Sequence, residues 1–130
     1  MTSTKSGAHL PPTHLSYHIL LALADRPRHG YGIIKEIEAR TEGAMSPSTG
    51  ALYLALQRME EGALIEEAPE RPGGDEDDPR RKYYRLTARG RQVAAAETRR
   101  LVALLGVAVE KRLIGGGDVR AATMGGGADG

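Results

Sequence analysis

Apolar residues recur three and four positions apart in the first half of the chain, which is the spacing of amphipathic helices. The first such segment runs from Thr13 to Ala24, and Asp25-Arg26-Pro27 ends it because the residue before a proline avoids helical backbone angles. The second opens at His29-Gly30-Tyr31-Gly32 and stops before Gly43, where a left-handed C-cap is expected. The pattern predicts two helices joined by a short turn.

A third helix is predicted from Ser46 to Glu61, with Ser46 as its N-cap and Pro47 at its first helical position. Its apolar stripe consists of Leu52, Ala55, Leu56 and Met59. The opposite side lacks the Glu/Lys pairs of an ordinary solvated helix and carries Gly50, Tyr53, Leu54 and Gln57, with Thr49 and Arg58 on its two borders. Such small and hydrogen-bonding residues suit contact with base edges and phosphates. The alternative is a core helix whose outer face has no function.

The pattern then changes to that of a β-hairpin. Leu64 to Glu67 is predicted as one strand, and Lys82 to Leu86, where aromatic or apolar residues alternate with basic ones, as the returning strand. The intervening Pro69 to Pro79 is rich in proline, glycine and acid and is predicted to be the loop. Three helices followed by a hairpin indicate a winged helix-turn-helix with the hairpin as the wing. The predicted fold class is α+β, mostly helical.

A long helix is predicted from Ala88 to about Ile114, with Thr87 as its cap. Because the winged helix is complete before it begins, its apolar stripe has no obvious partner within the chain. Burial against a second copy is therefore expected, at about 1.5–3 kcal/mol for each Leu or Val, and folding back onto its own domain is the alternative. The residues assigned to this dimerisation seam are Val93, Leu101, Leu104, Leu105 and Ala108.

The predicted organisation follows from these elements. Residues 1–12 form a flexible N-terminal arm, 13–87 the winged-helix DNA-binding domain and 88–114 the C-terminal dimerisation helix. Gly115-Gly116-Gly117 is expected to stop that helix, and 115–130 form a Gly-rich tail that is predicted to be disordered.

The distribution of charge matters more than the net charge, which is only +1. Nine acidic residues and a single arginine lie between Glu60 and Asp78, whereas eight basic residues and a single glutamate lie between Arg80 and Arg100. A basic block of this kind can bind phosphate. Arg80, Arg81 and Lys82 stand where the second strand of the wing begins, and the alternative for them is a charged strand edge that prevents aggregation.

The sequence gives little support for a metal site, a calcium loop or an enzyme active site. There is no cysteine, and His14 and His18, one helical turn apart, lack the further ligands of a metal site. Asp75 to Asp78 lacks the ligand spacing of a calcium loop. We expect no enzyme activity, no metal and no cofactor. The longest apolar run, Ile19 to Ala24, is too short to cross a membrane and no signal peptide is visible, so a cytoplasmic protein is expected.

Three segments together resemble the PadR family of bacterial transcription regulators: His29 to Ile33, Gly50 to Ile65, and Arg81 to Gly90. The resemblance covers about Leu15 to Arg91. It implies a winged-helix homodimer with a C-terminal dimerisation helix, usually repressing transcription and released by a small-molecule effector. The single C-terminal helix is similar to that of the shorter branch of the family.

The chain also departs from the family pattern. Leu54 stands where a proline usually follows the tyrosine, and the acidic tip from Asp75 to Asp78 is unusual in a wing. Family members that sandwich aromatic drugs use a tryptophan on the last helix, and this chain has none. No effector-binding residue is therefore carried over.

The leading hypothesis is a homodimeric, sequence-specific DNA-binding repressor that recognises an inverted-repeat operator in double-stranded DNA. The residues expected to contact DNA are Tyr31, Ser46, Ser48, Thr49, Tyr53, Gln57, Arg58, Arg80, Arg81 and Lys82. Thr49, Tyr53 and Gln57 are expected to face the major groove, and Tyr31 either to bind a phosphate or to pack in the core. One alternative is a winged-helix protein-interaction module without DNA binding, and another is a ligand sensor.

Overall fold

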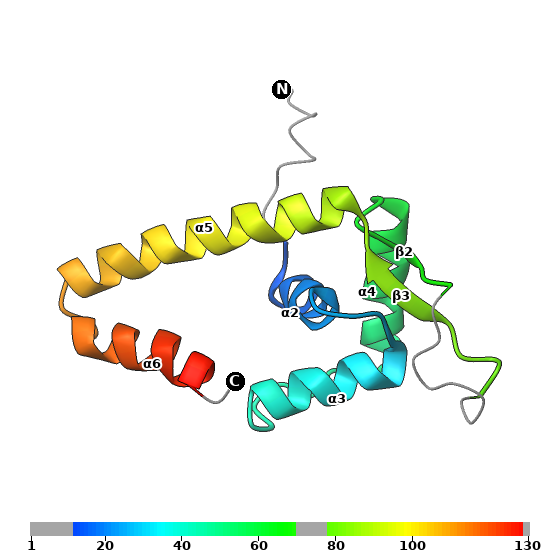
Figure 1. Cartoon of the computed structure of the whole chain (residues 1–130), viewed down its shortest axis with the longest axis horizontal. Helices are drawn as coiled ribbons and strands as arrows, with labels where there is room; N and C mark the ends of the chain where they lie inside the picture. Colours follow the sequence, from blue (N-terminus) through cyan, green and yellow to red (C-terminus); the bar gives the residue numbers. More distant parts are fainter. Residues whose placement is uncertain (1–11, 70–77, 129–130) are drawn as a thin grey trace. The chain divides into compact units, whose positions relative to one another are not determined.

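The computed structural model describes residues 12–69 and 78–128 of the 130-residue chain, with side chains up to residue 123. The chain forms two compact units, with the boundary between Glu97 and Thr98. The first unit holds helices α2, α3 and α4, three short strands and the beginning of α5 (Figure 1). Most of the predicted N-terminal arm, residues 70–77 of the predicted loop from Pro69 to Pro79, and residues 129–130 lie outside the described residues, and with them most of the acidic tip.

Three helices follow one another as predicted: α2 (His14–Leu23), α3 (Gly30–Arg40) and α4 (Thr49–Glu61). Thr13 caps α2, and its hydroxyl accepts a hydrogen bond from the Ser16 amide at 3.1 Å. At the end of α3 the chain turns through a left-handed Gly43, as expected, together with a left-handed Glu42.

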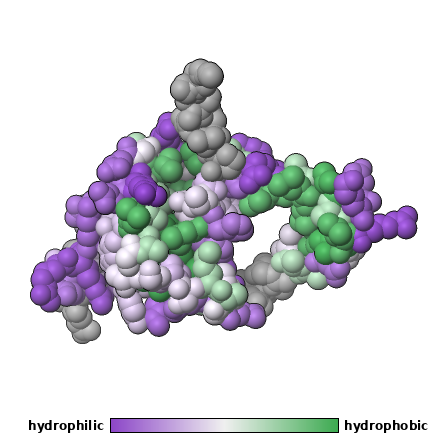
Figure 2. All heavy atoms as spheres, turned by 180° about the vertical axis from the view of Figure 1, so that it is seen from behind, coloured by the Kyte–Doolittle hydropathy of each residue, from purple (hydrophilic) through white to green (hydrophobic). Residues whose placement is uncertain are grey.

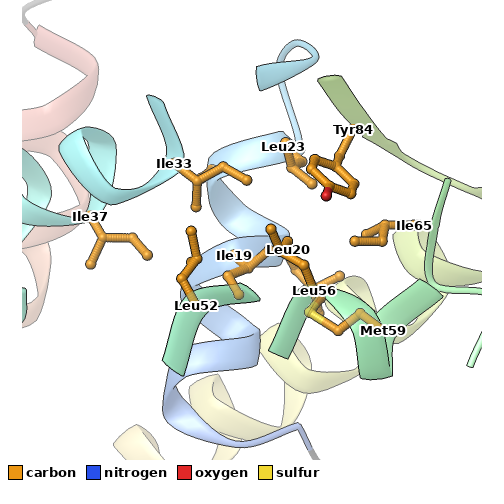
Figure 3. Close-up of a cluster of buried hydrophobic side chains, with 11 residues drawn as sticks. Ile19, Leu20, Leu23, Ile33, Ile37, Leu52, Leu56, Met59, Ile65 and Tyr84 are labelled. Carbon is orange, nitrogen blue, oxygen red and sulfur yellow. The ribbon is translucent and has the colours of Figure 1, made fainter. Parts of the chain in front are cut away.

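The core is built from the apolar stripes of these helices (Figure 3). α2 contributes Ile19, Leu20 and Leu23, α3 contributes Ile33 and Ile37, α4 contributes Leu52, Leu56 and Met59, and the strands contribute Ile65 and Tyr84. The predicted inward face of α4 is therefore confirmed. Because the chain has no Phe or Trp, aliphatic side chains fill this interior, and Tyr84 is the aromatic residue of the cluster.

The sheet is antiparallel, with strand order β1-β3-β2. β2 (Ile65–Glu67) and β3 (Tyr83–Leu86) form the predicted hairpin, in which Glu66 lies opposite Arg85. β1 (Arg28–His29) pairs with the other edge of β3. This strand was not predicted, because two residues are too few to show an alternating pattern.

The predicted start of the third helix is wrong by two residues. Ser48, and not Ser46, is the N-cap of α4: its hydroxyl accepts from the Ala51 amide at 3.1 Å. Pro47 precedes the cap and does not occupy the first helical position. The physical reason is that the Ser46 hydroxyl donates to the carboxylate of Glu38, while the Ser48 hydroxyl faces the first turn of the helix.

The long helix α5 (Ala88–Glu110) begins where predicted. The Thr87 hydroxyl caps it by accepting from the Gly90 amide at 2.9 Å. Its first turns pack within the first unit: a Cβ on Gly90 would lie 2.0 Å from the carbonyl oxygen of Leu64, and Val93 and Ala94 pack against the core. The compact unit therefore continues to Glu97, beyond the predicted domain end at residue 87.

α5 ends at Glu110, earlier than the predicted Ile114. Arg112 has a left-handed backbone (φ 64°), the Leu113 amide donates to the Ala108 carbonyl at 2.9 Å, and the Arg112 amide donates to the Val109 carbonyl at 3.0 Å. These two bonds form a Schellman motif, which satisfies the last carbonyls of a helix without a glycine here.

The prediction of a disordered tail is wrong for the described part, because Gly116–Ala128 forms helix α6. Its start is stabilised by Asp118, whose carboxylate accepts from the Gly115 amide at 3.1 Å. A carboxylate in the first turn satisfies an unpaired amide and interacts favourably with the helix dipole. Among the described residues, no helix has the length and apolar composition needed to cross a membrane.

Candidate nucleic-acid interface

A hollow of about 410 Å³ opens between the start of α3, the first half of α4 and the segment that leads into β3. Five of the residues predicted to bind DNA line it, although they come from three separate parts of the chain. The lining residues are His29, Tyr31, Tyr53, Asp78, Arg80, Arg81, Lys82 and Tyr84. Phenol hydroxyls and cationic side chains thus face the same space, and both kinds of group donate hydrogen bonds to phosphate oxygens.

Tyr31 and Tyr53 form the aromatic part of this surface. Tyr31 is 56% exposed, so the alternative of a packed core tyrosine is excluded. Tyr53 is also exposed, and a Cβ built on Gly30 would stand 2.2 Å from its hydroxyl oxygen. The glycine at the start of α3 therefore leaves the room that the Tyr53 side chain occupies.

His29 links the helices to the sheet at this point. Its Nδ1 accepts from the Gly32 amide at 3.1 Å and so caps α3. Its ring meets Tyr83 edge-on at 5.1 Å and lies nearly parallel to Tyr31 at 6.5 Å, and its Nε2 is 3.2 Å from Arg81 Nη1. The sequence analysis placed His29 at the opening of the second helix but assigned it no place in the site. The signal was its position directly before a helix, where side-chain acceptors are favoured.

The cations of the wing have carboxylate neighbours in the same chain. Arg80 Nε lies 3.2 Å from Asp78 Oδ1, and Lys82 Nζ lies 3.1 Å from Glu60 Oε2. Lys82 also stands over the Tyr84 ring at 5.4 Å from its centroid. The hydrogen bond with Glu60 raises the pKa of Lys82, which stays charged. Both cationic side chains remain exposed to solvent in these ion pairs.

The outer face of α4 is exposed, as predicted. Thr49, Gln57 and Arg58 are all exposed, and Ser48 is exposed while its hydroxyl serves as the N-cap. Gln57 Nε2 approaches Glu61 Oε2 at a long 3.5 Å. Ser46 is exposed as well but donates to Glu38, and this hydrogen bond lowers the pKa of the Glu38 carboxyl. Contact of these residues with DNA stays a prediction.

The sequence analysis assigned no role to Lys35, which lies beside Tyr31 in the structure. Its Nζ lies 5.3 Å from the centroid of the Tyr31 ring and 3.5 Å from Glu38 Oε1. A hydrogen bond with Tyr31, and then the charge of that residue and of Glu38, raises the pKa of Lys35. The spacing of four residues from Tyr31 places the two on one face of a helix and could have revealed the pair.

Comparison with known proteins identifies the family. The model of the transcriptional regulator PadR-like family matches residues 19–96. The chain belongs to the PadR-like family. This confirms the resemblance seen in the sequence, and because members of the family are transcription regulators it also confirms the expectation that the chain is not an enzyme.

Two relatives show how much of the PadR-like chain is shared. It is 36% identical over 78 residues to protein X of Lysinibacillus sphaericus, covering 60% of this chain and 69% of that protein. It is 33% identical over 97 residues to the transcriptional regulator YqjI of Escherichia coli strain K12, covering 75% of this chain and 43% of YqjI. The chain thus spans less than half the length of YqjI.

Solved structures agree on the fold. A PadR family transcription regulator from Clostridium difficile R20291 is 26% identical with a TM-score of 0.63, over 75% of this chain and 97% of that one. Bacillus subtilis PadR, solved in complex with operator DNA, is 23% identical with a TM-score of 0.54, over 65% of this chain and 46% of that one. The winged helix predicted from the sequence is therefore confirmed.

Part of the basic block of this PadR-like chain supports the fold. Arg85 Nε lies 2.8 Å from Glu66 Oε2 across the hairpin. Arg89 Nε donates to the Gly62 carbonyl at 3.1 Å, and Arg91 donates to the Ala24 carbonyl at 3.3 Å. Those two carbonyls lie at the ends of α4 and α2, where a cation also interacts favourably with the helix dipole.

The residues predicted for dimerisation separate into two groups. Val93 packs against the core of its own unit, so the seam that it was assigned to has an intramolecular partner at this position. In the second unit, Leu101 is 37% exposed and Leu104 is 51% exposed, and Leu105 and Ala108 are half-buried. Apolar side chains gather on the face of this unit that Figure 2 shows in green. Their burial against a second chain stays a prediction.

The histidine pair on α2 gives no metal site within the part of the chain that the structure describes, where no group of three candidate ligands occurs. His14 is exposed, and His18 is half-buried with its Nδ1 unpaired. Burial, and then the charges of Arg40 and His14, lower the pKa of His18.

Proposed function

We propose that this PadR-like regulator is a cytoplasmic homodimeric repressor that binds an inverted-repeat operator and is released by a small-molecule effector. α4 enters the major groove, and the wing formed by β2 and β3 lies along the sugar-phosphate backbone. Bacillus subtilis PadR, a member of the same family, was solved with operator DNA, which supports DNA as the partner.

The observation that carries the proposal is the hollow that joins α3, α4 and the wing. Tyr31, Arg81 and Lys82 line one space, and exposed residues of α4 continue beside it. Donors gathered from separate elements suit a phosphate backbone that runs past all of them. Tyr31, Ser46, Ser48 and Arg58, together with the wing cations, hold phosphates in this proposal.

Base recognition is assigned to the middle of α4. Gln57 can form two hydrogen bonds with adenine, and Thr49 can offer its hydroxyl or place its methyl group against thymine. Both side chains are exposed, with Gln57 on the side of α4 away from the buried stripe and Thr49 at the border of that stripe in the first turn. Tyr53 contributes from the wall of the hollow.

Dimerisation is assigned to the second unit, where Leu101, Leu104, Leu105 and Ala108 form an apolar stripe with exposed members. Two copies then present two α4 helices related by a twofold axis. Such dimers read half-sites about one helical turn apart, or roughly 10 base pairs from centre to centre.

Binding of the purified protein to duplex DNA tests the proposal. The probes are the upstream region of its own gene and a random duplex of the same length, each over a series of salt concentrations. We expect tighter binding to the upstream duplex and a linear fall of log affinity with log salt. Absence of salt-dependent binding to either duplex, with capture of a defined protein partner through α4, would favour the interaction module.

A further inference from the structure

One ion pair connects the proposed reading helix to the wing. Lys82 Nζ lies 3.1 Å from Oε2 and 3.4 Å from Oε1 of Glu60, near the end of α4. The lysine stands one residue before β3 and also lines the hollow. In the free protein, the ammonium group that is assigned to a phosphate is therefore paired with a carboxylate of the same chain.

The ion pair of Lys82 and Glu60 is exposed enough for another anion to replace Glu60. The side chains of Lys82 and Glu60 are 43% and 32% exposed. Water screens pairs of this kind, and forming one changes an equilibrium constant by about fivefold at most. A phosphate that is brought close can therefore displace the carboxylate, whereas a loosely held one has to compete with it.

The neighbouring residue of α4 repeats the arrangement. The Glu61 carboxylate is 3.5 Å from the side-chain nitrogen of Gln57, the residue proposed to read a base. The last turn of α4 thus places two carboxylates beside two donors of the proposed interface.

We propose that Glu60 competes with DNA phosphate for Lys82 and thereby limits the affinity of the wing for DNA. This inference rests on the proposed function. On random DNA, where α4 is not seated in the groove, Lys82 stays with Glu60 and neutralises no phosphate. On the operator, base contacts by α4 hold the backbone against the wing, and the phosphate takes Lys82 from Glu60.

Replacing Glu60 by Gln tests the proposal, because Gln keeps the size of the side chain and removes its charge. We expect Glu60→Gln to raise affinity for a random duplex by about threefold to fivefold. The slope of log affinity against log salt should become steeper by about one on that duplex, which corresponds to one more phosphate contact. On the upstream duplex the slope should stay unchanged, but the affinity should rise at least as much, because the wild-type protein has to break the ion pair there and the variant does not.

The chain offers a matched control in Glu66. Glu66→Gln removes the same charge from an ion pair of the wing, but its partner Arg85 is not among the residues that line the hollow. It should leave the salt slope on random DNA unchanged. Equal effects of the two substitutions would show a general effect of net charge and would overturn the role of Glu60.

A double substitution shows whether Glu60 acts through Lys82. In a Lys82→Gln background, Glu60→Gln should no longer raise affinity for random DNA or steepen its salt slope. If Glu60→Gln weakens binding to both duplexes, the pair is a brace for the wing and the proposal is overturned. If the wild-type protein binds neither duplex, the proposed function itself fails, which is a different result from bound duplexes that Glu60→Gln leaves unaffected.

Discussion

The Tyr53 hydroxyl lies directly over Gly30, so that a Cβ on Gly30 would stand 2.2 Å from its oxygen and 2.5 Å from the ring carbon that carries it. The first turn of α3 and the outer face of α4 therefore pack together because the Tyr53 side chain occupies the space that Gly30, which has no side chain, leaves open. Gly30 itself is buried. The contact makes the position of Tyr53 dependent on the residue at position 30.

Substitution of Gly30 by Ala should displace the Tyr53 ring, because the added methyl group and the hydroxyl cannot share the space. We expect a loss of at most about 1 kcal/mol in the free energy of unfolding, the low end for overpacked sites, because the clashing atoms are the far end of an exposed side chain that can turn away. Urea unfolding measures it. In the Tyr53→Ala background the same Gly30→Ala change should cost clearly less, since the clashing ring is absent. Equal costs in both backgrounds would show that Tyr53 does not occupy this space.

Substitution of Leu101 by Asp should break the proposed dimer, because it places an unpaired charge in an apolar seam at a cost of several kcal/mol. Sedimentation velocity over a range of concentrations should then show monomers. Ala103→Asp is the matched control: Ala103 is exposed and lies on the opposite side of α5 from the stripe. A Leu101→Asp protein that stays dimeric at low concentration would place the seam elsewhere.

Substitution of Gln57 by Ala should cost about 1–3 kcal/mol of binding free energy on the operator and much less on random DNA. The reason is that a base contact is lost while phosphate contacts remain. Affinities on both duplexes at one salt concentration measure it, and the melting temperature should hardly move because Gln57 is exposed. Gln92→Ala, on the exposed side of α5, is the control and should change neither affinity. Equal losses on both duplexes would mean that Gln57 only positions the protein.

Substitution of Ala63 by Gly should stabilise the protein by about 1 kcal/mol, because Ala63 has a left-handed backbone (φ 61°) that favours glycine. Thermal unfolding measures the change. Ala96→Gly is the matched contrast, since Ala96 is an exposed residue inside α5 and the same change should cost about 1 kcal/mol there. A loss of stability in the Ala63→Gly protein would show that the left-handed turn after α4 is wrong.

The parts of the fold that the sequence predicted are those with local patterns. The stripe of Leu52, Leu56 and Met59 repeats at helical spacing, and β3 is marked by its aromatic residues Tyr83 and Tyr84, although both are buried and the expected alternation is absent there. The features that were missed depend on contacts between distant segments. β1 exists because β3 offers an edge to Arg28 and His29, and nothing in those two residues shows it.

Helix ends show the same distinction at single residues. Ser46 and Ser48 are both suitable caps, and the contact that separates them is the hydrogen bond of the Ser46 hydroxyl to Glu38, eight residues earlier in the chain. After α4 the left-handed position falls on Ala63, although glycine stands next to it at position 62. The basic block was read as phosphate-binding, but Arg89 and Arg91 reach carbonyls that lie 27 and 67 positions earlier in the chain.

The end of α4 and the start of α5 are joined by more than the chain. The Thr87 hydroxyl lies 2.6 Å from the Ala63 carbonyl, Arg89 holds the Gly62 carbonyl, and Gly90 lies against the backbone of Leu64. The direction in which α5 leaves is thereby coupled to the direction in which α4 points. In a dimer assembled through the later turns of α5, the angle at this junction would set the separation of the two α4 helices. In the proposed complex, a small change of this angle would alter the distance between the two half-sites of the operator, without altering any residue that is proposed to touch a base.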